Sequence, residues 1–394
     1  MKKYWLMGAA YFGLYGFLLT VTPMIALQHG RTSVEASVLV AALAVVGFVG
    51  DLTVSALSAR AGKSIAIFAG ALLIAVGMTL ALIFGGFLSL LGATGIIGLG
   101  LAYIVTPVLG GLSTRAGRNQ VRAQAINAVV QRAGALGLGL FLGLAVAETS
   151  AIVAVVAVAL TTLILGAALV YRDELGRDHA VATKDAAPTD PAWAPVLRSN
   201  DVRRALVVNA ATPIWIIAGS SLFPLMLLAL GRSELLVPAI VAREVVAMIT
   251  ALLVARTRSR QVLFIAWTAS MAVGAAGFLL ATAAGGDVLI VALFALHGAC
   301  IALGIVFANV LFYDGTTDES RLIAFSFGSM SSRTAALLFP LAFGVALTIS
   351  PLSAAVATVA IIVLLSLTVV VMQMRSASAQ AAPHSETSFQ RNEV

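Results

Sequence analysis

Long apolar runs alternate with short polar or charged connections along most of the chain. Between Ser64 and Thr114, for example, there is no Asp, Glu, Lys or Arg. A helix needs about 20 apolar residues to cross a bilayer, and these runs reach that length. The pattern predicts twelve helices, over 4–28, 34–58, 64–84, 88–113, 122–147, 149–171, 205–230, 234–255, 261–283, 287–312, 322–347 and 350–373.

The composition assigns these helices to a membrane. Hydrophobic residues make up 60% of the chain and charged residues 10%, far from soluble globular usage. We therefore predict an all-α polytopic membrane protein with about twelve transmembrane helices. The first helix is too long for the apolar region of a cleaved signal peptide, so we expect it to be retained. The single Cys300 excludes an intramolecular disulfide, and we expect neither a metal nor a cofactor.

Basic residues fall mainly on one side of the predicted topology. The N-terminus, several short connections and the segment from Arg172 to Arg204 carry them, whereas the opposite side has only Arg31 and Arg232. The positive-inside rule then places both termini in the cytoplasm of an inner-membrane protein. This asymmetry accounts for the formal charge of +7, so we do not expect nucleic-acid binding.

A polar, proline-bearing segment divides the helices into two sets of six. Residues 172–204 are interpreted as a cytoplasmic linker between halves spanning 1–171 and 205–374. Residues 375–394 are rich in Ser, Ala and Gln and are interpreted as a disordered cytoplasmic tail.

The two halves resemble each other at one fixed offset. Arg132 opens RAGALGLGLFLGLA and Arg333 opens RTAALLFPLAFGVA, 201 positions later (333 − 132). The turn Gly30-Arg31-Thr32 recurs as Gly231-Arg232-Ser233 at the same offset. Parallel repeats of this kind form a substrate site at their interface near the middle of the membrane.

At these features the chain resembles the major facilitator superfamily. The family's signature G-x-L-a-D-R-x-G-R-[RK] is matched in part by the segment from Ser55 to Ser64, which keeps Arg60, Gly62 and Lys63 but has Ala59 in place of the acid. The resemblance implies two pseudo-symmetric six-helix bundles and a conformational role for this loop. Four glycines in the helix over 122–147 are similar to a helix of the family's proton-linked exporters, although close helix packing also explains them: Gly134, Gly137, Gly139 and Gly143.

Five charged residues are predicted near the middle of the membrane: Asp51, Arg132, Arg243, Glu244 and Arg333. A charge at this depth costs at least about 3 kcal/mol and persists only with a partner, a ligand or water. In the fold that the chain resembles, the helix over 34–58 faces that over 322–347, and the helix over 122–147 faces that over 234–255. The expected pairs are therefore Asp51 with Arg333 and Glu244 with Arg132, acting in gating or proton coupling or as static structural pairs. Arg243 is left unpaired.

By the same resemblance, the first, fourth, seventh and tenth helices line a cavity. Among the predicted liners, His297 has two interpretations, a proton carrier or a neutral core histidine. Three arginines against two acids give a midplane charge of +1 (3 − 2), which favours an anionic substrate contacting Arg132, Arg243 and Arg333. The other predicted liners are Tyr11, Tyr15, Thr20, Tyr103, Thr106, Asn209, Thr212 and Trp215.

The leading hypothesis is a monomeric secondary transporter that exports a small amphiphilic or anionic compound, such as a metabolite, a siderophore-like chelator or a drug, in exchange for protons. Uptake of an organic acid is the alternative within transport, and a membrane scaffold or receptor is a third. An enzyme is not expected, because neither H-E-x-x-H nor G-x-S-x-G occurs. The expected partners are a small-molecule substrate and the bilayer.

Overall fold

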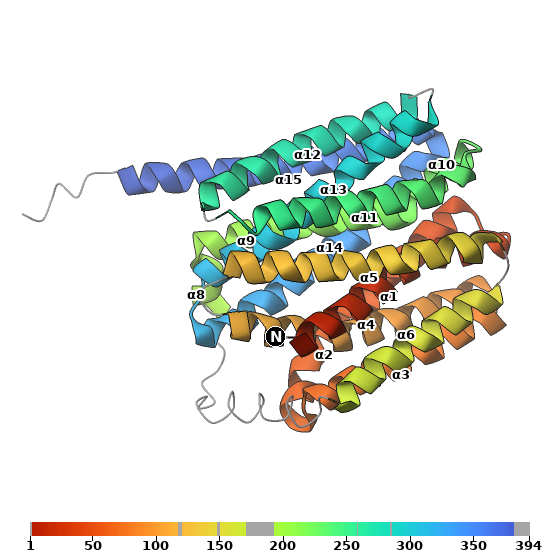
Figure 1. Ribbon diagram of the computed structural model, residues 1–394, viewed down its shortest axis with the longest axis horizontal. Coiled ribbons are helices and arrows are strands. Elements are labelled where there is room, and N and C mark those ends of the chain that lie inside the picture. Colours follow the sequence, from red (N-terminus) through yellow and green to blue (C-terminus); the bar gives the residue numbers. More distant parts are fainter. Residues whose placement is uncertain are drawn as a thin grey trace, which may run out of the picture.

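The computed structural model describes residues 2–116, 120–147, 150–170, 193–257, 259–283 and 286–381. These residues form one bundle of long helices, with successive long helices running in opposite directions (Figure 1). The elements are α1 (Lys2–Gln28), α2 (Ser33–Ala61), α3 (Lys63–Ile83), α4 (Phe87–Ala116), α5 (Gln120–Ala147), α6 (Ser150–Val170), α8 (Trp193–Arg198), α9 (Asn200–Ile217), η1 (Ala218–Leu222), α10 (Phe223–Ala229), η2 (Ser233–Leu235), α11 (Leu236–Val254), α12 (Arg260–Ala283), α13 (Asp287–Asp314), α14 (Asp318–Ile349) and α15 (Pro351–Ala381).

The predicted all-α architecture is confirmed. Helices α1 to α6 follow the first six predicted segments, α9, η1 and α10 together form the seventh, and α11 to α15 form the last five. Within the described residues, ten helical stretches are long and apolar enough to cross a membrane. Large apolar side chains such as Leu88 and Ile349 are 79% and 75% exposed on the outside of the bundle, as expected for a surface that faces lipid.

The predicted linker, 172–204, extends too far toward the C-terminus. Helix α9 already begins at Asn200, and Ser199 caps it by accepting a hydrogen bond from the Val202 N–H. Two of the charges that suggested a linker are paired at the start of this helix: Asp201 accepts from Arg204 Nη1 at 3.1 Å and from Arg260 Nη1 at 2.9 Å. Residues 171–192 lie outside the described residues.

The predicted tail also begins too early. Helix α15 continues past Arg375 to Ala381, because the Ser, Ala and Gln residues that suggested disorder can also extend a helix. The remainder of the predicted tail, 382–394, is outside the described residues.

The repeated turns have the same backbone structure in both halves. Gly30 and Gly231 have φ values of 69° and 70°, in the left-handed region that favours glycine. The Arg31 N–H bonds the Ala26 carbonyl at 3.0 Å, and the Arg232 N–H bonds the Leu227 carbonyl at 2.8 Å. Both arginines also bond a later segment of their own half: Arg31 donates to the Gly85 carbonyl between α3 and α4, and Arg232 donates to Asp287 at the start of α13, each at 3.0 Å.

The two halves meet mainly along two pairs of helices. Helix α2 packs on α14 and α5 packs on α11, as the resemblance implied, and α5 also contacts α13. The α5 and α11 ribbons run side by side in Figure 1. We call the end of the bundle where α1 begins and α8 lies the linker face, and the end with the Gly30 and Gly231 turns the far face.

The loop predicted to have a conformational role is a sharp break between α2 and α3. Gly62, with φ of 93°, ends α2 and begins α3, and its N–H bonds the Ser58 carbonyl at 3.0 Å. Arg60 is exposed beside it, and Lys63 is half-buried. The conformational role of Arg60, Gly62 and Lys63 stays a prediction.

Candidate substrate cavity

A cavity lies between the two halves, at the middle of the bundle. It offers about 150 Å³ to the centres of water-sized molecules. Helices α1, α4, α9 and α13 line it as predicted, and α2, α5 and α14 contribute as well. The lining residues are Tyr11, Phe12, Tyr15, Leu19, Val40, Leu43, Ala44, Leu101, Val105, Thr106, Gln131, Asn209, Thr212, Pro213, Ile216, Ile217, Ile305, Asn309, Phe312, Phe325, Gly328, Ser329, Ser332, Arg333 and Ala336.

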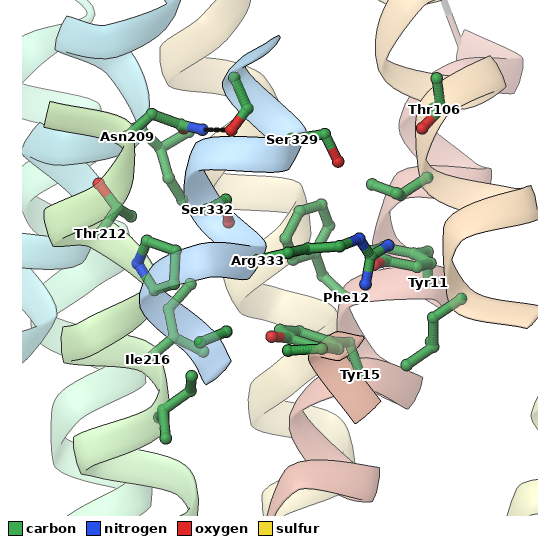
Figure 2. Close-up of a pocket in the computed structure, with 18 of the residues that line it drawn as sticks. Tyr11, Phe12, Tyr15, Thr106, Asn209, Thr212, Ile216, Ser329, Ser332 and Arg333 are labelled. Atoms are coloured by element: carbon green, nitrogen blue, oxygen red, sulfur yellow. Dashed lines mark hydrogen bonds between the residues drawn. The ribbon is translucent and has the colours of Figure 1, made fainter. Parts of the chain in front are cut away.

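Arg333 is the charged side chain that lines this cavity. It projects from α14 toward Tyr11 on α1, with Tyr15 beside it (Figure 2). The Tyr11 and Tyr15 rings are stacked, with centroids 6.0 Å apart and planes 5° from parallel. On the α9 side, Asn209 donates to the Gly328 carbonyl at 2.6 Å.

The predicted pair between Asp51 and Arg333 is present. Arg333 Nε donates to Asp51 Oδ2, and this contact joins α14 of the second half to α2 of the first. The Asp51 carboxylate also accepts hydrogen bonds from Ser329 Oγ at 2.6 Å and Thr106 Oγ1 at 3.1 Å. Asp51 is 4% exposed, and these donors satisfy the hydrogen-bonding capacity of its buried carboxylate. Neither Nη atom of Arg333 makes a hydrogen bond within the described residues.

The predicted pair between Arg132 and Glu244 is also present, outside the cavity lining. Arg132 Nη1 lies 3.4 Å from Glu244 Oε2 and joins α5 to α11. The Arg132 guanidinium also stands over the Phe12 ring, 5.8 Å from its centroid. Glu244 is 0% exposed and Arg132 is 3% exposed, so this contact is sealed from the bulk.

The prediction that Arg243 is unpaired is wrong. Its Nε donates to Glu244 Oε1 at 2.9 Å, because its long side chain folds back along the helix to the neighbouring carboxylate. Glu244 thus serves two arginines, and this buried cluster has a net charge of +1 (2 − 1). Arg132 Nε and Arg243 Nη1 have no hydrogen-bond partner in the described part of the chain. Neither arginine lines the cavity.

Besides Arg132 and Arg243, four of the predicted lining residues lie elsewhere. On α9, the positions facing the cavity are Asn209, Thr212, Pro213, Ile216 and Ile217. Trp215 falls on the other side of the helix, where its Nε1 donates to Met271 Sδ at 2.8 Å. The other three are Thr20, Tyr103 and His297.

His297 is packed among aromatic rings. Its ring centroid is 4.6 Å from that of Trp215 and 4.7 Å from that of Phe294. It is 0% exposed. This environment favours the core interpretation of His297 over the proton carrier.

Thr20 and Tyr103 make polar contacts outside the cavity. Thr20 Oγ1 donates to the Gly16 carbonyl at 3.0 Å. The Tyr103 hydroxyl lies 3.1 Å from Thr53 Oγ1. Thr20 is thus bonded within α1, and Tyr103 connects α4 to α2.

Several lining residues escaped sequence reasoning: Phe12, Gln131, Asn309, Ser329 and Ser332. The 201-residue offset was the signal that could have found some of them. Four sets of lining residues are related by this offset (for example 332 − 131): Tyr11 and Thr212, Phe12 and Pro213, Tyr15 and Ile216, and Gln131 and Ser332. Corresponding positions of the two halves therefore face each other across one cavity.

Comparisons with known proteins support the architecture. No protein-family model and no curated protein matches the sequence. In contrast, 286 chains of solved structures match the fold. One is a crystal structure of a mutant of the nucleoside transporter NupG, with 12% identity over 94% of this chain and 98% of that chain and a TM-score of 0.63. This chain has the major facilitator fold. At this identity the similarity shows the fold and does not transfer a substrate.

Proposed function

We propose that the protein is a secondary active transporter that works by alternating access. The observation that carries this proposal is a cavity enclosed between two repeated six-helix halves, at the depth where buried ion pairs join them. Such a site reaches either side of the membrane when one half rocks against the other. Transport in place of catalysis or scaffolding explains why both the cavity and the cross-half charges exist.

The two ion pairs are the proposed gates. Asp51 with Arg333 and Arg132 with Glu244 each join residues of different halves. Separation of the halves must break them, and a buried charge left without its partner is costly, by roughly 3–5 kcal/mol. A substrate or a proton that replaces the lost partner therefore lowers the barrier to the conformational change.

We propose a small amphiphilic or anionic substrate. Apolar side chains such as Leu19, Leu43 and Ile305 form much of the cavity wall and suit an apolar body. Because Asp51 engages Arg333 through Nε, the two Nη atoms are available to a carboxylate of the substrate. The residues proposed to contact it are Tyr11, Tyr15, Asn209 and Arg333; Arg132, Arg243, Trp215 and His297, predicted from sequence, are not among those that line the cavity.

We propose that the proton gradient drives export. Asp51 and a substrate carboxylate compete for Arg333, so proton and substrate occupancy are linked at one arginine. Because a proton on Asp51 favours substrate binding, this linkage on its own carries the two together and supports the alternative, organic-acid uptake. The resemblance to proton-linked exporters motivates the direction. We further propose a monomer in the inner membrane with both termini in the cytoplasm and no bound cofactor.

Flux in proteoliposomes tests this function. Purified protein is reconstituted, and uptake of radiolabelled benzoate, a simple aromatic carboxylate, is followed under an imposed pH gradient of either sign. The passive permeation of benzoate is subtracted with protein-free vesicles. We expect protein-dependent flux that reverses with the gradient and is lost in Arg333→Gln. Benzoate movement down the pH gradient together with protons would instead indicate the alternative, organic-acid uptake, and the absence of any protein-dependent flux would refute transport of this class.

A further inference from the structure

The Gln131 side chain is a buried amide that lines the cavity without a hydrogen-bond partner. It lies on α5 and is 1% exposed. Neither Oε1 nor Nε2 has a partner among the described residues. A buried polar group left unpaired costs roughly 1–3 kcal/mol, and this amide presents two such atoms. The protein keeps a neutral donor and a neutral acceptor side by side at the cavity wall.

Other amides around the cavity are satisfied by the protein itself. Asn309 Nδ2 donates to Gln124 Oε1 at 3.0 Å, and Asn209 Nδ2 donates to the Gly328 carbonyl at 2.6 Å. Asn127 shares the lack of partners but does not line the cavity. Gln131 is therefore the amide in this set that combines burial, a cavity position and unpaired atoms.

The repeat sharpens the contrast between the two sides of the cavity. The residue that corresponds to Gln131 in the second half is Ser332, and each precedes a duplicated arginine. In the first half the amide lines the cavity while Arg132 turns to Glu244. In the second half Arg333 itself lines the cavity. One half thus offers a neutral amide and the other half a guanidinium.

We infer that Gln131 forms a subsite for a neutral substrate group that presents a hydrogen-bond acceptor next to a donor, as in a lactam, a cis-amide or the equivalent edge of a heterocycle. Nε2 donates to the carbonyl of that group and Oε1 accepts its N–H, which satisfies both orphaned atoms at once. The inference rests on the proposed transport function and narrows its substrate to a carboxylate that also carries such an edge. The cavity holds on the order of ten water-sized volumes, which suits a single substituted ring.

Binding of matched heterocyclic carboxylates to the detergent-purified full chain tests the subsite separately from transport. Orotate carries a carboxylate and lactam edges, whereas 1,3-dimethylorotate keeps the ring and the carboxylate but has no N–H to donate. We expect the wild-type chain to bind orotate at least about tenfold more tightly in calorimetry, the effect of losing a well-placed hydrogen bond. Gln131→Leu, similar in volume, should abolish this preference, because it removes the oxygen that accepts the N–H of orotate.

The matched control is Gln28→Leu, the same substitution at an exposed position at the end of α1, which should keep the full preference. If the wild-type chain shows no preference for orotate, or if Gln131→Leu retains it, the amide serves only bound water and the subsite is refuted. Proton-dependent benzoate flux that persists in that case leaves the transport function standing. Flux that is absent while orotate binding follows the expected pattern refutes transport and keeps the subsite.

Discussion

Arg132 and Arg333 occupy corresponding positions of the two halves, but only Arg333 lines the cavity. Arg132 lies outside the lining, 3.4 Å from Glu244. The acids that partner them do not correspond: subtracting 201 from 244 gives Leu43, eight positions before Asp51 on α2. At about 1.5 Å per residue, Glu244 lies roughly 12 Å nearer the far face than Asp51 by helix position. The repeat has therefore kept its arginines while the acids diverged, which gives the two halves different electrostatic roles.

The shared carboxylate of Glu244 predicts unequal costs of neutralisation within its cluster. Glu244→Gln leaves Arg132 and Arg243 without a counter-charge in a site sealed from water, so we expect a loss of roughly 3–5 kcal/mol in unfolding free energy. Arg243→Gln leaves the pair of Arg132 with Glu244 intact and should cost clearly less. Thermal unfolding in detergent measures both, with the exposed Glu234→Gln as the matched control. Equal destabilisation by the two cluster variants would contradict the shared role of Glu244.

A steric change without any charge change can probe the gate at Arg333. A Cβ added at Gly47, on α2, would stand 2.0 Å from Arg333 Nη1 and 3.0 Å from the Gly98 carbonyl. Gly47→Ala should therefore push the guanidinium away from its present position. We expect benzoate binding to weaken about tenfold, which corresponds to the loss of one good hydrogen bond. Gly92→Ala is the control, because a Cβ there meets no atom within 4 Å. Wild-type benzoate affinity in Gly47→Ala, measured by calorimetry, argues that Arg333 does not hold the carboxylate.

The helices and the repeat could be predicted from sequence, because apolar run length and a fixed offset are one-dimensional signals. The two cross-half ion pairs were predicted from the helix neighbours that the family resemblance implied. The partner of Arg243 could not be predicted, since a flexible side chain can reach several carboxylates. Its contact with the adjacent Glu244 depends on rotamer and packing. The prediction that Trp215 lines the cavity was wrong for a different reason. The position of a residue along a helix gives its depth in the membrane, but the rotation of α9 about its axis decides which side chains face the cavity. Gln131 was missed because an uncharged amide does not stand out in an apolar run.

The orientation in the membrane is open to direct labelling. The positive-inside count predicts that the linker face is cytoplasmic and the far face external. In a Cys300→Ser background, Gln28→Cys at the far face should react with an impermeant maleimide in intact cells. Asp185→Cys, in the predicted linker, should react only after the membrane is permeabilised. Strong labelling of position 185 in intact cells reverses the topology and with it the assignment of export.

Coupling between Asp51 and Arg333 is the most direct test of gating. Asp51→Asn leaves Arg333 without its carboxylate, and Arg333→Gln leaves Asp51 with only the Ser329 and Thr106 hydroxyls. Each single change strands a buried partner, so each should shift the conformational equilibrium, whereas the double change strands neither. We expect a coupling energy of roughly 1–3 kcal/mol in a double-mutant cycle scored by the labelling rate of Ser332→Cys in the cavity, because flux is already lost in Arg333→Gln.

A second cycle on Arg232 and Asp287 serves as the control. That pair is 3.0 Å apart but is exposed on the far face and lies within one half, so its coupling should be below about 1 kcal/mol and should leave cavity labelling unchanged. Because Arg232→Gln with Asp287→Asn removes the same two charges from the chain as Arg333→Gln with Asp51→Asn, a difference between the cycles isolates burial and the position between halves from net charge. Strictly additive effects for Asp51→Asn and Arg333→Gln would show that the contact is static packing, and the gate would then have to lie elsewhere on the interface.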